Sequence, residues 1–179
     1  MNNAKKIRIL FYKTPWKLKP KYFFNWLISL RTWSKYSHIE IWTPDSMGFG
    51  TLEDASGTCY TSTMRGKDNG TVSRDASGVL DHPENWDYIE IELTAGQYGL
   101  LLALMTTEVE CNMGYSKWDI MKFISLIHIA DNDRNICSEF VNNMLVLIGF
   151  IKGYGIVSPE AVHKKLNKLG LKTKELKGK

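Results

Sequence analysis

Residues 37–43 have the sequence SHIEIWT, and this stretch determines the fold prediction. Ile39 and Ile41 alternate with His38, Glu40 and Trp42. That period of two is typical of a β-strand whose two faces differ in character. The pattern therefore predicts a strand that holds an imidazole and a carboxylate on the face opposite its isoleucines.

Strand patterns around this stretch give way to helix patterns later in the chain. Short alternating runs predict strands over residues 6–12, 51–55, 58–61 and 86–93, and we expect the last of these to be the final strand. Thr94 and Gln97 have the spacing of a capping box and predict a helix that continues to about Cys111. Apolar periodicity predicts further helices over residues 22–31, 118–127 and 136–148.

The final predicted helix has the clearest boundary signals. Ser158 is a preferred cap residue, Pro159 suits the first helical position, and Gly170 suits the end. The polar, glycine-rich residues 64–78 predict a long loop. Three polar residues are cap candidates for the helix at 136–148: Asn132, Asp133 and Asn135.

The chain of 179 residues is long enough for one domain with a real core. A hydrophobic fraction of 44% and a charged fraction of 23% are typical of soluble globular proteins and argue against wholesale disorder. No repeat or linker divides the chain, and strands precede most helices. We therefore expect a single α+β domain, an antiparallel β-meander or barrel packed against a helical layer.

Basic residues are concentrated at both ends of a chain whose net charge is +4. The first acidic residue is Glu40, and a lysine-rich run closes the chain after His163. Such ends are typical of a solvated lysine-rich surface, a weak contact with an anionic surface or membrane is the alternative interpretation, and no specific nucleic acid is expected. Neither a signal-peptide core nor an apolar span of about 20 residues is visible, so we expect a cytoplasmic protein as synthesised.

The three cysteines include no CxxC pair, so each thiol is judged by its position. Cys137 opens the helix predicted over residues 136–148, where backbone N–H groups and the helix dipole favour a thiolate. Cys111 lies near a helix end and Cys59 lies in a strand, and neither gains this stabilisation. Cys137 is therefore the candidate nucleophile, and a buried structural cysteine is the alternative interpretation.

A thiol nucleophile needs a base, and the base needs a group that orients it. His38 lies on the polar face of an otherwise apolar strand. His82, His128 and His163 fall in a loop, after an apolar helix and on a lysine-rich helix, which are positions typical of surface or capping histidines. The candidate pair is Cys137 with His38.

Four short motifs together resemble a known family: SHIEI at 37–41, LEDA at 52–55, ICSEFV at 136–141 and VSPE at 157–160. Their order and spacing are similar to the circularly permuted branch of the NlpC-type papain-like cysteine peptidases and amidases, in particular its YiiX-like members. In that branch a histidine strand comes first, a polar residue lies on the next strand, and the nucleophile opens a late helix. The resemblance covers about residues 7–166. It implies a permuted papain-like domain over residues 1–170, followed by a basic C-terminal tail at 171–179.

The resemblance also implies roles for individual residues. Cys137 would be the nucleophile, His38 the base, and Glu53, one hairpin later, the third catalytic residue. Glu40 is the rival for that third role, but residues two apart on a strand stand about 6.5–7 Å apart, so Glu40 would reach the ring only by bending. Two further residues are candidates for substrate binding or support, each with a structural alternative as a core or cap residue: Tyr115 and Ser138.

The predicted chemistry is acyl transfer through a covalent intermediate on the thiol. The resemblance implies a cysteine hydrolase, a peptidase or amidase acting on peptide or isopeptide amides, including peptidoglycan-like ones, and it favours a bacterial or viral source. A lipid acyl hydrolase or acyltransferase is one alternative, and a non-catalytic binding or virion-associated protein that retains the fold is another. No cofactor and no metal are expected, because no paired cysteine or histidine spacing suits zinc.

Overall fold

The computed structural model describes residues 4–14, 34–44, 56–63, 70–111, 136–155 and 157–176. These residues form a six-stranded antiparallel sheet in the order β4-β3-β2-β1-β5-β6. The strands are β1 Lys5–Lys13, β2 Tyr36–Pro44, β3 Gly57–Thr63, β4 Gly70–Asp75, β5 Trp86–Leu93 and β6 Thr173–Glu175. The helices are α2 Ser77–Leu80, the 3-10 helix η3 Pro83–Asn85, α3 Ala95–Glu110, α5 Cys137–Leu147 and α6 Pro159–Lys168. The mixed α+β class predicted from the sequence is confirmed.

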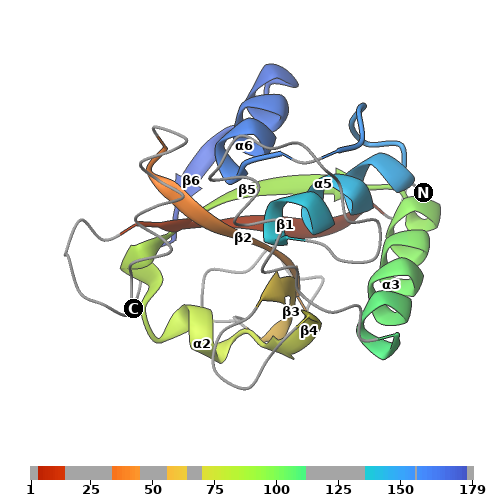
Figure 1. Ribbon diagram of the computed structural model, residues 1–179, viewed down its shortest axis with the longest axis horizontal. Coiled ribbons are helices and arrows are strands. Elements are labelled where there is room, and N and C mark those ends of the chain that lie inside the picture. The colour runs from red at the N-terminus through yellow and green to blue at the C-terminus, as the bar shows by residue number, and fades with distance from the viewer. Residues whose placement is uncertain are drawn as a thin grey trace.

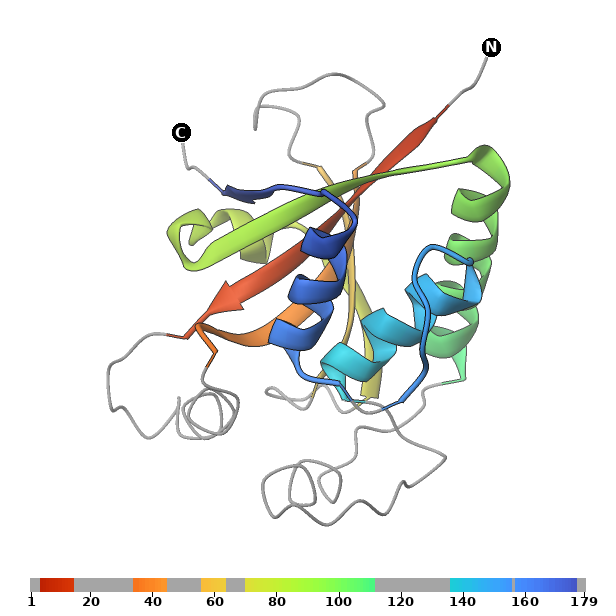
Figure 2. The ribbon, with the colours of Figure 1, turned by 90° about the horizontal axis from the view of Figure 1, so that it is seen from above.

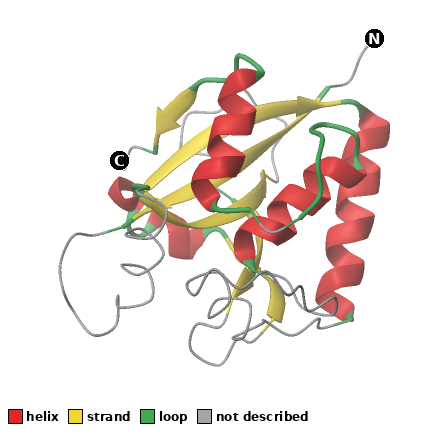
Figure 3. Cartoon of the chain, turned by 45° about the horizontal axis from the view of Figure 1, so that its top comes forward, coloured by secondary structure: helices red, strands yellow, loops and turns green. Residues whose placement is uncertain are grey.

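Helices cover both faces of the sheet unequally. Figure 1 shows α5 and α6 on one side of the central strands and the short α2 on the other. Seen from above in Figure 2, α6, α5 and α3 follow one another across the molecule, and α3 packs against α5. The view in Figure 3 shows the strands passing beneath α5 and α6. The larger helices therefore form a layer on one face of the sheet.

Strand pleating separates the core into two apolar clusters. Ile9, Phe11 and Ile41 belong to the cluster that includes side chains of α3, α5 and α6. Leu10 and Trp42, each one position away in sequence, belong to the cluster on the opposite face. This is the alternation expected of adjacent residues in a strand. Strand β2 is consequently buried on both faces along nearly its whole length.

Local sequence signals account for the helix boundaries. Thr94 accepts a hydrogen bond from the backbone N–H of Gln97 and completes the predicted capping box of α3. Ser158 caps α6 in the same way through Ala161, with Pro159 at the first helical position. These boundary predictions are confirmed. The N-cap residue of α5 is Ile136, whose side chain accepts no capping hydrogen bond.

Two predictions about strands are wrong. Residues 70–75, expected within a long loop, form strand β4, which pairs with β3 in a register that places Arg74 opposite Cys59. Because β4 is an edge strand that exposes Ser73 and Asp75, it lacks the apolar pattern of an inner strand. Strand β5 is not the final strand either, since Thr173–Glu175 pair with it as β6. Three residues are too few to show a periodicity.

Several predicted elements lie outside the described residues: the strand at 51–55, the helices at 22–31 and 118–127, and the cap candidates at 132–135. No helix in the described part of the chain combines the length and apolar character that a membrane crossing requires.

Candidate functional site

The side chains of His38 and Glu40 lie together on one face of β2. His38 is opposite Tyr12 and Glu40 is opposite Leu10 in the pairing with β1. His38 is 5% exposed and Glu40 is 0% exposed. His38 Nε2 lies 3.0 Å from Glu40 Oε1, so the carboxylate does reach the ring. The spacing argument against Glu40 fails because two long side chains on the same face can turn toward each other along the strand.

The contacts of Nε2 define the tautomer of His38. Thr61 Oγ1 lies 3.3 Å from Nε2 and 3.1 Å from the carbonyl oxygen of Ile39, to which it donates its proton. The oxygen of Thr61 and the ionised carboxylate of Glu40 therefore both face Nε2 as acceptors. Nε2 must carry the hydrogen, and Nδ1 is the basic nitrogen of the neutral ring.

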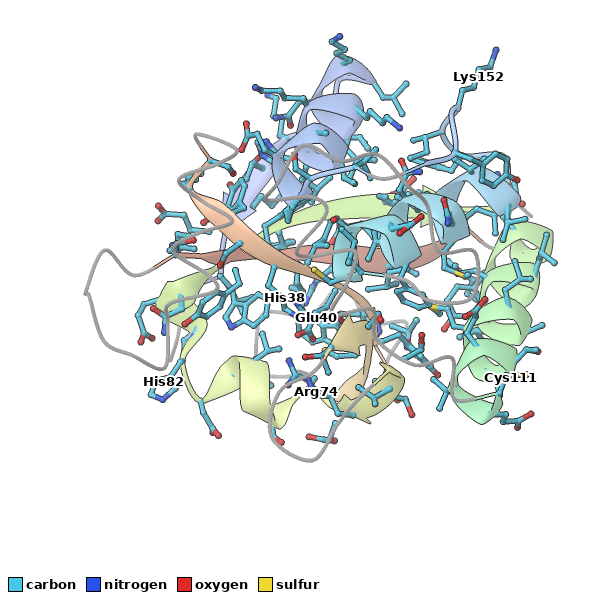
Figure 4. All side chains as sticks on the ribbon, in the orientation of Figure 1. His38, Glu40, Arg74, His82, Cys111 and Lys152 are labelled. Carbon is cyan, nitrogen blue, oxygen red and sulfur yellow. The ribbon has the colours of Figure 1, made fainter. Side chains whose placement is uncertain are left out.

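Arg74 brings a positive charge to the same carboxylate. Its Nη2 donates to Glu40 Oε1, the oxygen that His38 Nε2 also contacts. Figure 4 shows Arg74 and Glu40 on the side of β2 away from α5 and α6. A guanidinium next to a buried carboxylate favours the ionised form of that carboxylate. Sequence reasoning missed Arg74 because it lies in the segment expected to be a loop.

Cys137 is the first residue of α5 and is 4% exposed. The first intrahelical hydrogen bond runs from the N–H of Phe140 to the carbonyl of Ile136. The N-cap residue Ile136 accepts no capping hydrogen bond through its side chain. Backbone donors at such a position can stabilise a negative charge on sulfur or on a substrate oxygen.

Cys137 and His38 belong to elements that pack against each other, and they approach from different faces of the sheet. Cys137 lies in the apolar cluster of Ile39, whereas the His38 ring faces Trp86, with ring centroids 6.4 Å apart. The hydrogen-bonded ladder between β2 and β3 ends at Ile41 and Tyr60. Beyond that pair the ladder of backbone hydrogen bonds between β2 and β3 stops. Helix α5 packs against both strands.

Ser138 has a structural role in the start of α5. Its Oγ donates to the carbonyl oxygen of Val157, 2.5 Å away, and the side chain is buried. Val157 precedes Ser158, the cap of α6, and Glu160 of the same helix accepts a hydrogen bond of 2.9 Å from Ser34. The two sequence motifs around Cys137 and Ser158 are thus joined, and Ser138 supports the position of α5.

The remaining described thiols and histidines lie in other surroundings. Burial, with a further contribution from the Glu40 charge, raises the pKa of the Cys59 thiol, and Cys111 is exposed. His82 is exposed, but His163 packs half-buried against the ring of Tyr36, and burial lowers the pKa of His163. The expectation of a surface or capping role is therefore wrong for His163.

Asp87 forms a second buried polar cluster, which sequence reasoning also missed. Its Oδ2 accepts hydrogen bonds from the hydroxyl of Tyr36 at 2.7 Å and from Nζ of Lys35 at 2.8 Å, and Oδ1 lies 3.2 Å from Nζ of Lys13. Burial alone would raise the pKa of Asp87, but the hydrogen bonds from Lys35 and Tyr36 and the charge of Lys13 outweigh it, so the pKa is lowered. This cluster fastens the first residue of β2 to β5.

Glu53 and Tyr115 lie outside the described residues. Within the ranges that the structure describes, no group of three or more histidine, cysteine, aspartate or glutamate side chains is placed to hold a metal ion.

Comparison with models of known protein families and with curated proteins gives no match for this chain.

Proposed function

We propose that this protein is a cysteine hydrolase of the permuted NlpC-type papain-like kind, with Cys137 as nucleophile and His38 as base. The observation that carries the proposal is the buried pair of His38 and Glu40. A carboxylate 3.0 Å from Nε2 leaves Nδ1 as the basic nitrogen. The helix packed against this strand begins at Cys137. Acyl transfer requires an oriented imidazole beside an activated thiol, and the proposal is that the His38 ring and the Cys137 sulfur meet in this way.

In the proposed reaction, His38 Nδ1 takes the proton of the Cys137 thiol as the sulfur attacks an amide carbonyl carbon. The N–H groups of the first turn of α5 stabilise the tetrahedral oxyanion. The carbon–nitrogen bond then breaks, and His38 gives its proton to the leaving amine, which leaves a thioester on Cys137. Water, deprotonated by His38, attacks the thioester and releases a carboxylic acid and the free thiol. The contact between Cys137 Sγ and His38 Nδ1 is part of the proposal.

Glu40 takes the orienting role in this mechanism because its carboxylate contacts Nε2 directly. Glu53 remains the residue that the family resemblance implies for the same role. The substrate proposed is a peptide or isopeptide amide, including peptidoglycan-like peptides, and lipid acyl esters are the competing substrate class.

A non-catalytic binding protein is the second candidate, and one observation favours it. Cys137 is 4% exposed and lies within an apolar cluster, as a structural cysteine does. In that case the pair of His38 and Glu40 would stabilise the fold without performing chemistry.

Capture of the covalent intermediate tests the proposed function. The protein is incubated with peptidoglycan peptides, isopeptides and lipid esters, quenched in acid, and examined by intact mass and peptide mapping. We expect the mass of an acyl group on Cys137 with one substrate class, which also identifies that class. The exposed Cys111 provides the matched control, since Cys111→Ser should carry the same adduct. The proposal would be contradicted if the wild-type protein turned over substrate without any adduct and the Cys137→Ser variant kept its activity.

A further inference from the structure

Arg74 contacts the proposed catalytic pair from the edge strand β4. Its Nη2 donates to Glu40 Oε1, and His38 Nε2 contacts the same oxygen. We propose that Arg74 is a positioning residue, which anchors the Glu40 carboxylate so that this carboxylate orients the His38 ring. The inference rests on the proposed function for the catalytic role of His38, whereas the anchoring itself does not depend on that role.

Burial makes this anchor necessary. Glu40 is 0% exposed, and a carboxylate in such a place is stable as an ion only when a positive charge accompanies it. The Arg74 side chain is 36% exposed, so its guanidinium keeps contact with water while Nη2 reaches the buried oxygen. Arg74 therefore compensates the charge of Glu40 without itself being fully desolvated.

The weakly polar surroundings of His38 and Glu40 allow the charge of Glu40 to act on neighbouring ionisable groups. Cys59 lies opposite Arg74 on β3, and its pKa is raised by burial and by Glu40 and lowered by Arg74. Thr61 on β3 and Trp86 on β5 are uncharged neighbours of His38. In this weakly polar environment a single cation has a large influence on the protonation of the carboxylate.

Loss of the anchor has a specific chemical consequence. Without Arg74 the buried Glu40 carboxylate would bind a proton or turn away from Nε2. A protonated carboxyl group is a donor, and a donor that faces Nε2 forces the ring hydrogen onto Nδ1. His38 would then have no lone pair at the nitrogen that must accept the thiol proton. Arg74 thus preserves the tautomer of His38 through Glu40.

Replacement of Arg74 by methionine and by lysine tests this role. Nitrogen-15 chemical shifts of the His38 ring report the tautomer independently of any activity. We expect Arg74→Met to shift the hydrogen from Nε2 toward Nδ1 and to lower kcat by about 10–100-fold with KM unchanged. Arg74→Lys should restore the tautomer and most of kcat. Arg8 is the matched control, because it lies on the same sheet face against Trp42 but pairs with Glu90, and Arg8→Met should leave the tautomer unchanged.

A double-mutant cycle with Glu40→Gln keeps the test valid if Arg74→Met alone fails to fold. The Glu40→Gln/Arg74→Met variant has no carboxylate at position 40, and in the Glu40→Gln background removal of Arg74 should change kcat by less than about twofold. A further loss of tenfold or more would overturn the proposal, because Arg74 would then act on the substrate directly. An unchanged tautomer and kcat in Arg74→Met would overturn it as well. A third outcome separates the two proposals: Arg74→Met shifts the His38 tautomer, but Cys137→Ser leaves turnover intact. That result would refute the proposed function and would still support the anchoring role of Arg74.

Discussion

Replacing Cys137 with alanine is expected to lower turnover of the amide substrate at least about 1,000-fold, because the proposed reaction forms its covalent intermediate on this sulfur. The residual rate would come only from substrate binding and from the backbone N–H groups that stabilise the oxyanion. The effect on folding should be small, since alanine removes one buried atom and leaves Ser138 bonded to the carbonyl of Val157. The measurement is kcat/KM beside the free energy of unfolding in denaturant.

The other two thiols serve as controls for this loss. Cys111 is exposed and Cys59 is buried on the opposite face of the sheet from α5, and both should tolerate alanine with kcat within about threefold of the wild-type value. Comparable losses in all three variants, or full activity in Cys137→Ala, would show that Cys137 is not the nucleophile.

Asp87→Asn is expected to reduce the free energy of unfolding at neutral pH by about 2–3 kcal/mol, as loss of charged hydrogen bonds to a buried group does. Asp87 is 2% exposed, and its carboxylate accepts from Tyr36 and Lys35. Asparagine keeps one acceptor oxygen but loses the charge that attracts the two lysines. Since Tyr36 begins β2, the variant should also loosen the strand that carries His38.

The pH dependence of this effect follows from the lowered pKa of Asp87. A carboxyl group whose pKa is lower in the folded than in the unfolded protein stabilises the fold above its unfolded value of about 4, and this contribution is lost as pH falls through the folded pKa. The stability difference between wild type and Asp87→Asn should therefore be constant near neutrality and shrink below about pH 4. The exposed Asp81 is the control, and Asp81→Asn should show no such difference. A difference that persists unchanged in acid would contradict the assignment.

The sequence predicts the parts of this molecule that depend on local patterns. Alternation identified β1, β2 and β5, and the capping signals at Thr94 and Ser158 identified the starts of α3 and α6. The placement of Cys137 at a helix start followed from the apolar periodicity after it. Each of these depends on residues within one turn or one strand.

The features that the sequence could not predict depend on contacts between distant strands. The partnership of Arg74 with Glu40 requires the pairing of β3 with β4, and β4 has the polar composition of a loop because it lies at the sheet edge. Asp87 lies in a predicted strand, but only the packed fold brings Lys13, Lys35 and Tyr36 to it. Spacing along one strand likewise underestimated the reach of Glu40, because the period of a strand fixes Cα positions and leaves side-chain rotamers free.

Titration of the Cys137 thiol tests the central claim most directly. Ultraviolet absorbance of the thiolate is followed against pH in a variant that retains only this thiol, with Cys59 and Cys111 replaced by alanine. Burial opposes the thiolate, whereas the helix start and the His38 imidazole favour it. The proposed site predicts a thiolate that forms at pH 7.5 or below, roughly the range of activated thiols, and a midpoint that rises by at least about one pH unit in His38→Ala. A midpoint at or above the ordinary value of about 8.5 that His38→Ala leaves unchanged would contradict the pairing of Cys137 with His38.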